Sequence, residues 1–304
     1  MNDLKGILLP TTTPFDSDGR ISTLDITSNI KAWSARGVIG FVVLGSTGER
    51  VHLDEREYLE VIEASRAATD SVVIAGAGQQ STINTIKEIN SAARAGAHAV
   101  LVITPYFYRP AMTQETLVNY YTAVADASPV PVLLYSMPPL TGIKIEPETV
   151  ARLSEHPNII GVKDSSNDVA GFRLTVELCP HDFAVMTGNG TVLLDALRAG
   201  ATGAILAVGC VVPEICVEIF RLFAAGELER AEKLQTELTP LASAVTTKYG
   251  IGGLKAALDL AGYRGGAVRA PLRAPDDSVR AEIKSVFDRI YKILQDAQDV
   301  SCQS

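Results

Sequence analysis

Short runs of apolar and β-branched residues recur eight times along the chain, and this recurrence constrains the fold more than any other feature. The runs occupy residues 6–10, 38–45, 71–78, 99–105, 130–136, 158–163, 183–188 and 203–208. Continuous apolar runs of this length are typical of strands that are buried on both faces, as in a parallel sheet.

Helical patterns separate these runs, each with a cap residue in front and apolar residues at three- and four-residue spacing. The expected starts are residue 22, Asp54, Ser81 and Thr113. Gly96 and Gly200 are expected to end two helices just before the next strands. Strands that alternate with helices in eight successive units predict an α/β protein with a (β/α)8 TIM barrel.

A doubly wound open sheet is the alternative architecture, but no GxGxxG fingerprint follows the first strand. The apolar strand runs stop at about residue 226. Three helical patterns follow, at residues 227–245, 252–262 and 277–297. We therefore expect a barrel over residues 1–226 that carries the active site, and a C-terminal three-helix segment over residues 227–304.

Composition excludes several classes of partner. A net charge of −8 and a pI near 5.1 argue against binding to nucleic acid or to a membrane surface. The four cysteines show no paired spacing, which favours reduced thiols in a cytoplasmic protein. The four histidines are scattered, so no metal site is expected. The sequence also shows no signal peptide and no membrane-spanning run.

The active site of a TIM barrel lies at the C-terminal ends of the strands, which makes Lys163 the first candidate. A strand-end lysine is commonly a solvated cation. At a barrel rim, however, a desolvated amine loses its proton more easily and can attack a ketone to form a Schiff base. Tyr135 ends the preceding strand, where its phenol could relay protons or could simply be an interior aromatic group.

The stretch "GSTGER" at residues 45–50 is the third candidate element. Its backbone amides, together with the hydroxyls of Ser46 and Thr47, could form a nest for a carboxylate. Clusters of Gly, Ser and Thr are also common in ordinary turns.

Together these residues resemble the family of pyruvate-dependent class I aldolases that contains dihydrodipicolinate synthase and N-acetylneuraminate lyase. The likeness spans about residues 4–295. It rests on "PTTTPF" at 10–15, "GSTGE" at 45–49, "TPYF" at 104–107, "LLYSMP" at 133–138, "GVKDSS" at 161–166 and "GLKAALDLAG" at 253–262. The resemblance implies a (β/α)8 barrel with a C-terminal helical segment, a homotetramer built from two dimers, and no metal or organic cofactor.

The same resemblance implies roles for individual residues. Lys163 would form the imine with pyruvate or a pyruvoyl substrate, and Tyr135 would be the proton shuttle. Other family positions would hold the carboxylate and complete the relay (Ser46, Thr47) or line the pocket with backbone groups (Gly188, Ile205).

Two departures from the family pattern bear on the substrate. Dipicolinate-type synthases carry an arginine shortly after the tyrosine, whereas Leu140 stands there in this chain. The family's inter-subunit tyrosine falls at Phe107, between Tyr106 and Tyr108, so its hydroxyl role would pass to Tyr108. We expect Leu140 and Ser136 to contact the substrate.

"LLYSMPPLTGI", "HPNIIGVKDSSND", "KYGIGGLK" and "GYRGGAVRAPL" resemble 4-hydroxy-2-oxoglutarate aldolases more closely. The expected activity is therefore Schiff-base cleavage of a small hydroxy-oxo acid to pyruvate and glyoxylate. The alternative is 4-hydroxy-tetrahydrodipicolinate synthase, which condenses pyruvate with aspartate semialdehyde, with Arg109 replacing the missing arginine. A third possibility is a non-catalytic protein that binds 2-oxo acids.

Overall fold

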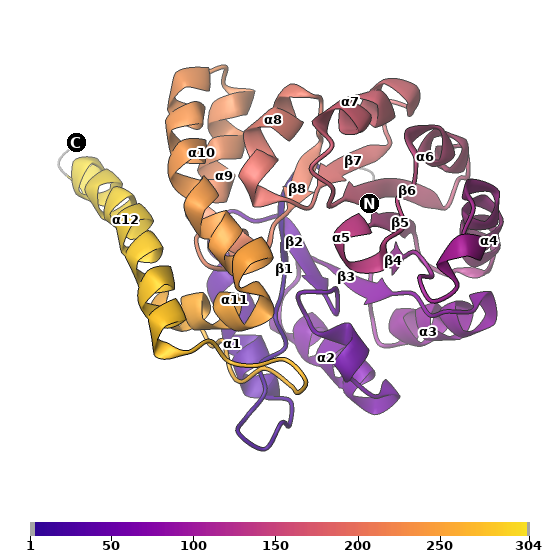
Figure 1. Cartoon of the computed structure of the whole chain (residues 1–304), viewed down its shortest axis with the longest axis horizontal. Coiled ribbons are helices and arrows are strands. Elements are labelled where there is room, and N and C mark those ends of the chain that lie inside the picture. Colours follow the sequence, from indigo (N-terminus) through magenta and orange to yellow (C-terminus); the bar gives the residue numbers. More distant parts are fainter. Residues whose placement is uncertain (1–3, 303–304) are drawn as a thin grey trace.

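The computed structural model describes residues 4–302, and eight parallel strands in it close into a barrel (Figure 1). The strands are β1 (Gly6–Pro10), β2 (Gly40–Val43), β3 (Val72–Ala77), β4 (Ala99–Ile103), β5 (Val132–Ser136), β6 (Ile159–Asp164), β7 (Ala184–Thr187) and β8 (Gly203–Ile205). Because β1 pairs with both β2 and β8, the sheet has no free edge. The predicted (β/α)8 barrel is confirmed, and the open sheet was the wrong alternative.

Helices surround the barrel on the outside (Figure 1). They are α1 (Thr23–Ser34), α2 (Glu55–Ala68), α3 (Thr82–Arg94), α4 (Gln114–Ala127), α6 (Pro147–Ser154), α7 (Val169–Leu178), α8 (Leu193–Arg198) and α9 (Pro213–Ala224). The short α5 (Pro138–Thr141) instead lies inside this ring, next to β5 (Figure 1).

The helix boundaries follow local chemistry. The side chains of Asp54, Ser81 and Thr113 each accept a hydrogen bond from the backbone N–H three residues ahead, as the sequence predicted. Gly96 and Gly200 follow the C-cap residues of α3 and α8 with φ of 98° and 99°, a conformation that glycine adopts without strain.

Six of the eight strands are shorter than their apolar runs, and the difference is largest for β2 and β8. The run at 203–208 contains only three strand residues, because the chain turns into a short 3-10 helix, Ala207–Cys210. The run at 38–45 leaves the ladder at Leu44, which has a left-handed φ of 61°. Both Leu44 and Leu206 stay buried, so the hydrophobic pattern extends beyond the hydrogen-bonded strand.

Alternation along each strand sorts side chains between two cores. On β5, Leu133 and Tyr135 point into the barrel, whereas Val132 and Leu134 pack against the surrounding helices. The inner core also contains Met186 and other strand residues from around the barrel. This alternation directs the Tyr135 ring toward the barrel interior.

The C-terminal segment consists of α10 (Leu228–Ser243), α11 (Gly250–Leu260) and α12 (Asp277–Cys302), and a π-helical turn, Ala244–Lys248, joins the first two. The three predicted helices are confirmed. In Figure 1 they lie along one side of the barrel, next to α9 and α1. Leu254 and Ile283 belong to the same hydrophobic core as the barrel helices, so this segment packs into the domain. The division at residue 226 stays a prediction.

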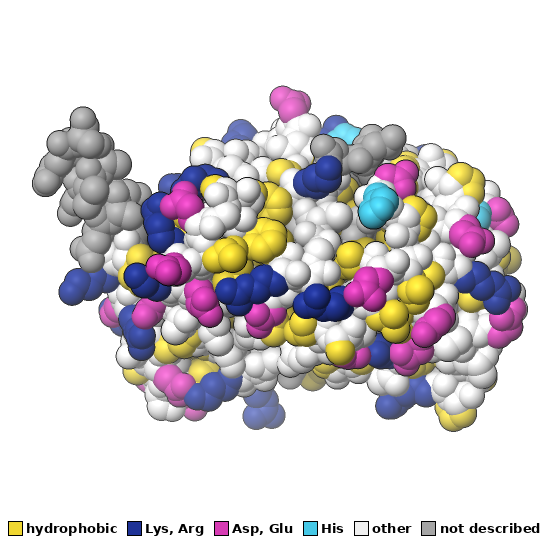
Figure 2. Space-filling view, turned by 90° about the horizontal axis from the view of Figure 1, so that it is seen from above, with side chains coloured by type: hydrophobic (Ala, Val, Ile, Leu, Met, Phe, Trp, Pro, Cys, Tyr) yellow, Lys and Arg dark blue, Asp and Glu magenta, His cyan; other side chains and the backbone are white. Residues whose placement is uncertain are grey.

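The surface mixes both signs of charge. On the face shown in Figure 2, basic and acidic side chains are interspersed, with small hydrophobic groups between them. Among the described residues, no helix is long and apolar enough to cross a membrane.

Candidate active site

Lys163 and Tyr135 lie side by side, because β5 and β6 pair with these two residues in register. Lys163 is only 5% exposed, and its Nζ lies 4.6 Å from the centroid of the Tyr135 ring. Among the described residues, Lys163 forms no ion pair with a carboxylate. The barrel therefore presents a buried, unpaired amine against a phenol, as a Schiff-base lysine requires.

Gly188, which follows β7, keeps space open beside this amine. A Cβ at Gly188 would lie 2.7 Å from Cε of Lys163 and would also collide with Oγ of Ser165. The Gly188 N–H donates to the carbonyl of Asp164 at 2.6 Å, which holds the loop close to β6. Gly188 thus lies beside Lys163, and its role in lining the substrate pocket stays a prediction. Ser165 is a further polar neighbour of the lysine.

The loop after β2 brings a hydroxyl to Tyr135. Ser46 Oγ lies 3.4 Å from the Tyr135 hydroxyl, and Thr47 beside it is buried. Two non-glycine residues in left-handed conformation flank this loop, Leu44 with φ 61° and Glu49 with φ 54°. Such conformations cost free energy and persist where surrounding contacts enforce them, commonly at functional sites.

A cavity of about 360 Å³ opens beside Tyr135 and Ser46. Its wall also contains the aromatic ring of Tyr106 and, from α5, Leu140 and Thr141. Lys163 is not part of this wall. Tyr135 is therefore shared between the amine and the cavity, a position suited to moving protons between them.

The remaining predicted residues occupy different places. Ile205 is fully buried at the end of β8 in the inner core. Ser136 is not part of the cavity wall, and its Oγ accepts a hydrogen bond from the Ile145 N–H at 3.3 Å. Phe107 and Tyr108 are about 70% exposed and pack edge to face on each other, outside the cavity wall. The catalytic role of Tyr108 stays a prediction.

Further polar groups lie near these loops, at strand ends where the sequence places the active site. The hydroxyls of Thr12 and Thr104 are buried at the ends of β1 and β4 without a hydrogen-bond partner in the described part of the chain. A buried ion pair also joins Glu49 to Lys255 of α11. The sequence signal for this pair was a lysine within the otherwise apolar stretch "GLKAALDLAG".

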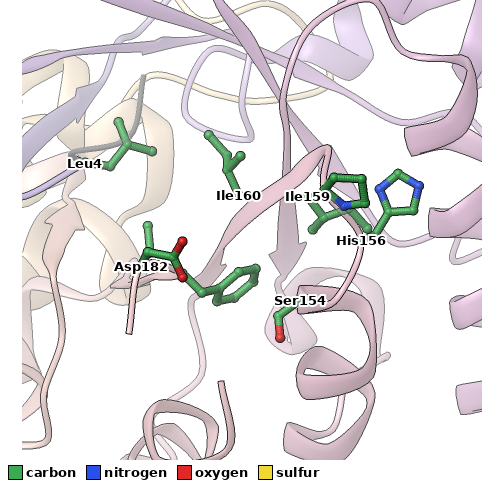
Figure 3. A pocket seen from close by; sticks show the side chains of 9 residues that line it. Leu4, Ser154, His156, Ile159, Ile160 and Asp182 are labelled. Carbon is green, nitrogen blue, oxygen red and sulfur yellow. The ribbon is translucent and has the colours of Figure 1, made fainter. Parts of the chain in front are cut away.

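A second cavity, of about 270 Å³, lies at the opposite end of the barrel (Figure 3). Ile159, Ile160 and Phe183 line it near the starts of β6 and β7. His156 also lines it, but its Nε2 is paired with Asp126 at 3.1 Å. In TIM barrels this face serves stability rather than catalysis.

Comparisons with known proteins agree with this geometry. Residues 3–290 match the dihydrodipicolinate synthetase family. The chain belongs to this family. It is therefore a pyruvate-dependent class I lyase/aldolase, which confirms the resemblance stated from the sequence and the expectation of an enzyme rather than a non-catalytic binding protein. Within the described residues, no group of three or more His, Cys, Asp or Glu could hold a metal ion.

Individual relatives resemble the chain over almost its whole length. It is 33% identical to 4-hydroxy-tetrahydrodipicolinate synthase of Methanothrix thermoacetophila, over 96% of this chain and 99% of that protein. A monomeric dihydrodipicolinate synthase variant superposes with a TM-score of 0.90 at 30% identity, covering 94% of this chain and 96% of that one. YagE, a prophage protein of the same family from E. coli K12 solved in complex with pyruvate, gives a TM-score of 0.89 at 28% identity, covering 95% and 99%.

Proposed function

We propose that this enzyme is a 4-hydroxy-tetrahydrodipicolinate synthase, which condenses pyruvate with aspartate semialdehyde. Curated relatives that match the chain nearly end to end carry this name. They support the synthase better than the 4-hydroxy-2-oxoglutarate aldolase that the sequence fragments favoured. The main structural support for this chemistry is the buried amine of Lys163, which lies against the Tyr135 ring, while the Ser46 hydroxyl lies beside the Tyr135 phenol.

In the proposed mechanism, Nζ of Lys163 attacks the keto carbon of pyruvate, and water leaves to give an imine. The protonated imine then draws electrons as a methyl proton is removed, which forms an enamine. The enamine carbon attacks the aldehyde carbon of the semialdehyde and forms the new carbon–carbon bond. Tyr135 moves the protons in these steps, and Ser46 extends the relay from its hydroxyl.

We assign the pyruvate carboxylate to the loop that contains Ser46 and Thr47. Hydroxyls and backbone amides at a tight turn form a nest for an anion. Gly188 leaves room beside the lysine, because a side chain there would collide with Cε of Lys163.

The carboxylate of the semialdehyde needs a cation, and we assign it to Arg109. Leu140 cannot supply one, although it lines the cavity. The Arg109 guanidinium lies against Gly142 at the end of α5, where a Cβ at Gly142 would be 2.9 Å from Nη1. Arg109 is exposed and forms no ion pair within the described residues. Arg109 is not part of the cavity wall, but Gly142 directly follows Thr141, which is, so the guanidinium lies close to this end of the cavity.

Cleavage of 4-hydroxy-2-oxoglutarate is the second candidate, favoured by one observation. Leu140 makes the cavity wall apolar at the position where dipicolinate-type synthases carry arginine. The same lysine, phenol and hydroxyl would serve this reaction, so only the distal part of the site distinguishes the two.

One preparation of the enzyme can decide between them, by comparing kcat/KM for semialdehyde condensation with kcat/KM for pyruvate release from 4-hydroxy-2-oxoglutarate. The synthase proposal expects condensation to be faster.

The contribution of Arg109 can be estimated from its hydrogen bond to the substrate carboxylate. A hydrogen bond to a charged group is worth about 1.5–3 kcal/mol. Because Arg109 is exposed, we expect the low end, so Arg109→Met should lower condensation about tenfold.

Leu140→Arg in the Arg109→Met background should restore condensation, because it returns a cation to the same end of the cavity. Arg36→Met, which removes a remote partly exposed arginine on the helix side of the barrel, is the matched control and should change neither reaction. If the unmodified enzyme cleaves 4-hydroxy-2-oxoglutarate faster than it condenses the semialdehyde, the synthase proposal is wrong and the aldolase proposal takes its place.

We further propose a homotetramer in the cytoplasm. Three exposed apolar side chains line the cavity, those of Val51, Leu140 and Leu272. Phe107 and Tyr108 lie outside the cavity wall and are also exposed. A partner subunit over this apolar region would remove its side chains from water. Cys179, Cys210 and Cys216 are buried free thiols, as expected in a reducing compartment. Sedimentation of the purified enzyme tests the assembly, and a monomer would contradict it.

A further inference from the structure

Glu49 and Lys255 form an ion pair that is withdrawn from water almost completely. The side chains are 1% and 2% exposed, and Nζ of Lys255 lies 2.6 Å from Oε1 of Glu49. The lysine comes from α11 of the C-terminal segment, whereas the glutamate ends the loop that contains Ser46 and Thr47. The pair therefore connects two parts of the chain that are far apart in sequence.

Lys255 has its hydrogen-bonding capacity fully used. It donates to the Thr13 carbonyl at 2.8 Å and to the Ala267 carbonyl at 2.6 Å, in addition to Glu49. An ammonium group has three N–H donors, so none is left over. This distinguishes Lys255 from the other buried lysine, Lys163, whose amine has no carboxylate partner.

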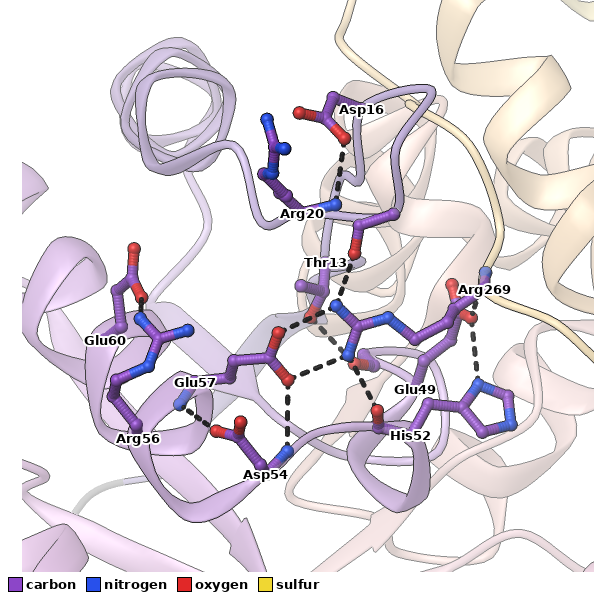
Figure 4. A network of polar contacts seen from close by, with 12 residues as sticks. Thr13, Asp16, Arg20, Glu49, His52, Asp54, Arg56, Glu57, Glu60 and Arg269 are labelled. Atoms are coloured by element: carbon purple, nitrogen blue, oxygen red, sulfur yellow. Dashed lines mark hydrogen bonds and ion pairs between the residues drawn. The ribbon is translucent and has the colours of Figure 1, made fainter.

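Glu49 is held just as firmly. Its second oxygen, Oε2, accepts from the Arg269 backbone N–H at 3.1 Å and lies 3.2 Å from Nδ1 of His52. The Arg269 guanidinium in turn forms two hydrogen bonds of 2.8 Å with Glu57 (Figure 4). Both carboxylate oxygens of Glu49 are thus occupied, which sets the orientation of its side chain.

Stability of the fold is not a sufficient reason for a buried ion pair of this kind. Desolvation of two buried charges can exceed their mutual attraction, and burial lowers the pKa of Lys255 against the opposing effect of Glu49. Glu49 also adopts a left-handed backbone conformation, which is unfavourable for a residue with a side chain. The surroundings enforce both features, which indicates that the geometry of this loop matters.

The contacts of the pair lead to the backbone of Ser46, whose hydroxyl lies beside that of Tyr135. The Glu49 N–H donates to the Ser46 carbonyl at 3.2 Å, across one turn of the loop. Thr13, whose carbonyl accepts from Lys255, donates its own hydroxyl to the Gly48 carbonyl at 2.7 Å. Lys255 therefore anchors the loop twice, once through Glu49 and once through Thr13.

We propose that Glu49 and Lys255 are positioning residues for the reaction, which hold the Ser46–Thr47 loop at the distance from Tyr135 that the relay and the carboxylate nest require. Lys255 of the C-terminal segment thereby contributes to the active site without being part of the cavity wall. This inference rests on the roles assigned above to Ser46 and Thr47.

The test compares Lys255→Met and the isosteric Glu49→Gln with Leu258→Ala. Leu258 is fully buried on the same helix, so its truncation destabilises the fold without disturbing the pair. Each variant is measured for KM of pyruvate, kcat, melting temperature and the rate of pyruvate-dependent trapping by borohydride. A purely structural role would lower the melting temperature alone.

Lys255→Met should raise KM for pyruvate about tenfold and lower kcat about 10- to 100-fold, since misplacing catalytic groups by about 1 Å costs about a hundredfold. Glu49→Gln keeps the shape, so it should fold and shift both parameters in the same direction by less. The double variant should be no worse than Lys255→Met, because the two residues act as one unit.

Several results would overturn the inference. They are unchanged KM and kcat in folded Glu49→Gln, additive effects in the double variant, or an equal change of KM in Leu258→Ala. The unmodified enzyme serves as the reference for the proposed function. If it is not trapped by borohydride with pyruvate, the lysine assignment fails together with this inference. If it is trapped and the Glu49 and Lys255 variants are unaltered, only this inference fails.

Discussion

Replacing Gly188 by alanine tests the geometry around the reactive amine most directly. A Cβ at this position would lie 2.7 Å from Cε of Lys163, whereas ordinary contacts begin near 3.4 Å. It would also collide with Oγ of Ser165, the end of a short side chain that can rotate away. The lysine has less freedom, because it is buried between β5 and β7. Lys163 must therefore retreat by about 0.7 Å.

The size of the effect follows from this displacement. A misplacement of about 1 Å at a reacting group costs about a hundredfold in rate. We therefore expect Gly188→Ala to lower kcat and the rate of imine formation about 10- to 100-fold. Inserting one methyl group into a packed region costs about 1–3 kcal/mol of stability, so the variant should still fold.

The assay is the rate of pyruvate-dependent trapping by borohydride, which reports the imine without the second substrate. Ser165→Ala alone and Gly188→Ala with Ser165→Ala are the controls. If Lys163 is the displaced group, the double variant stays as slow as Gly188→Ala. A trapping rate in Gly188→Ala that equals the unmodified enzyme would refute the geometry. If the trapping rate recovers in the double variant, the slow trapping in Gly188→Ala is caused by the collision with Ser165 and not by displacement of Lys163.

Three further predictions follow from the same site and its surroundings. Mass spectrometry after borohydride trapping should find one reduced pyruvoyl adduct, on Lys163, and none in Lys163→Met; an adduct on another lysine would contradict the assignment. Tyr135→Phe should lower turnover by about 10²–10⁴ while pyruvate still binds, as kinetics and calorimetric titration can measure. Hydrogen bonding to Arg269 lowers the pKa of Glu57 from its ordinary value of 4.5, so this contribution to stability is present above pH 4.5 and is lost as the pH falls through the folded-state pKa. Glu57→Gln should therefore weaken the fall in melting temperature below pH 4.5, and an unchanged acid profile would exclude this pair as a cause.

The period of a strand bears on Ser136, whose contact with the substrate stays a prediction. Tyr135 was expected to face the pocket, and successive side chains of a strand point to opposite faces. Ser136 therefore had to point away, and the structure pairs its hydroxyl with the Ile145 N–H. The expectation that Ser136 contacts the substrate came from the family resemblance and did not use this alternation.

Local chemistry was sufficient for the elements of the fold. Asp54, Ser81 and Thr113 cap their helices with hydrogen bonds that span three residues, so a short stretch of sequence contains the whole interaction. The eight apolar runs likewise contain enough information for strands buried on both faces, and their alternation with helices leads to the barrel. The presence of a lysine at the tip of β6 was visible for the same reason.

Only the tertiary structure decided how the distant groups meet. Lys163 stands beside Tyr135 because barrel closure sets the register of β5 and β6. The Glu49–Lys255 pair joins residues 206 positions apart, which no local pattern encodes. The left-handed conformation of Glu49 is likewise a tertiary feature, because a non-glycine residue adopts it where the surroundings compensate the cost. The sequence determines which side chains are present, whereas the distances between Lys163 and Tyr135 and between Glu49 and Lys255 result from the packing of the folded chain.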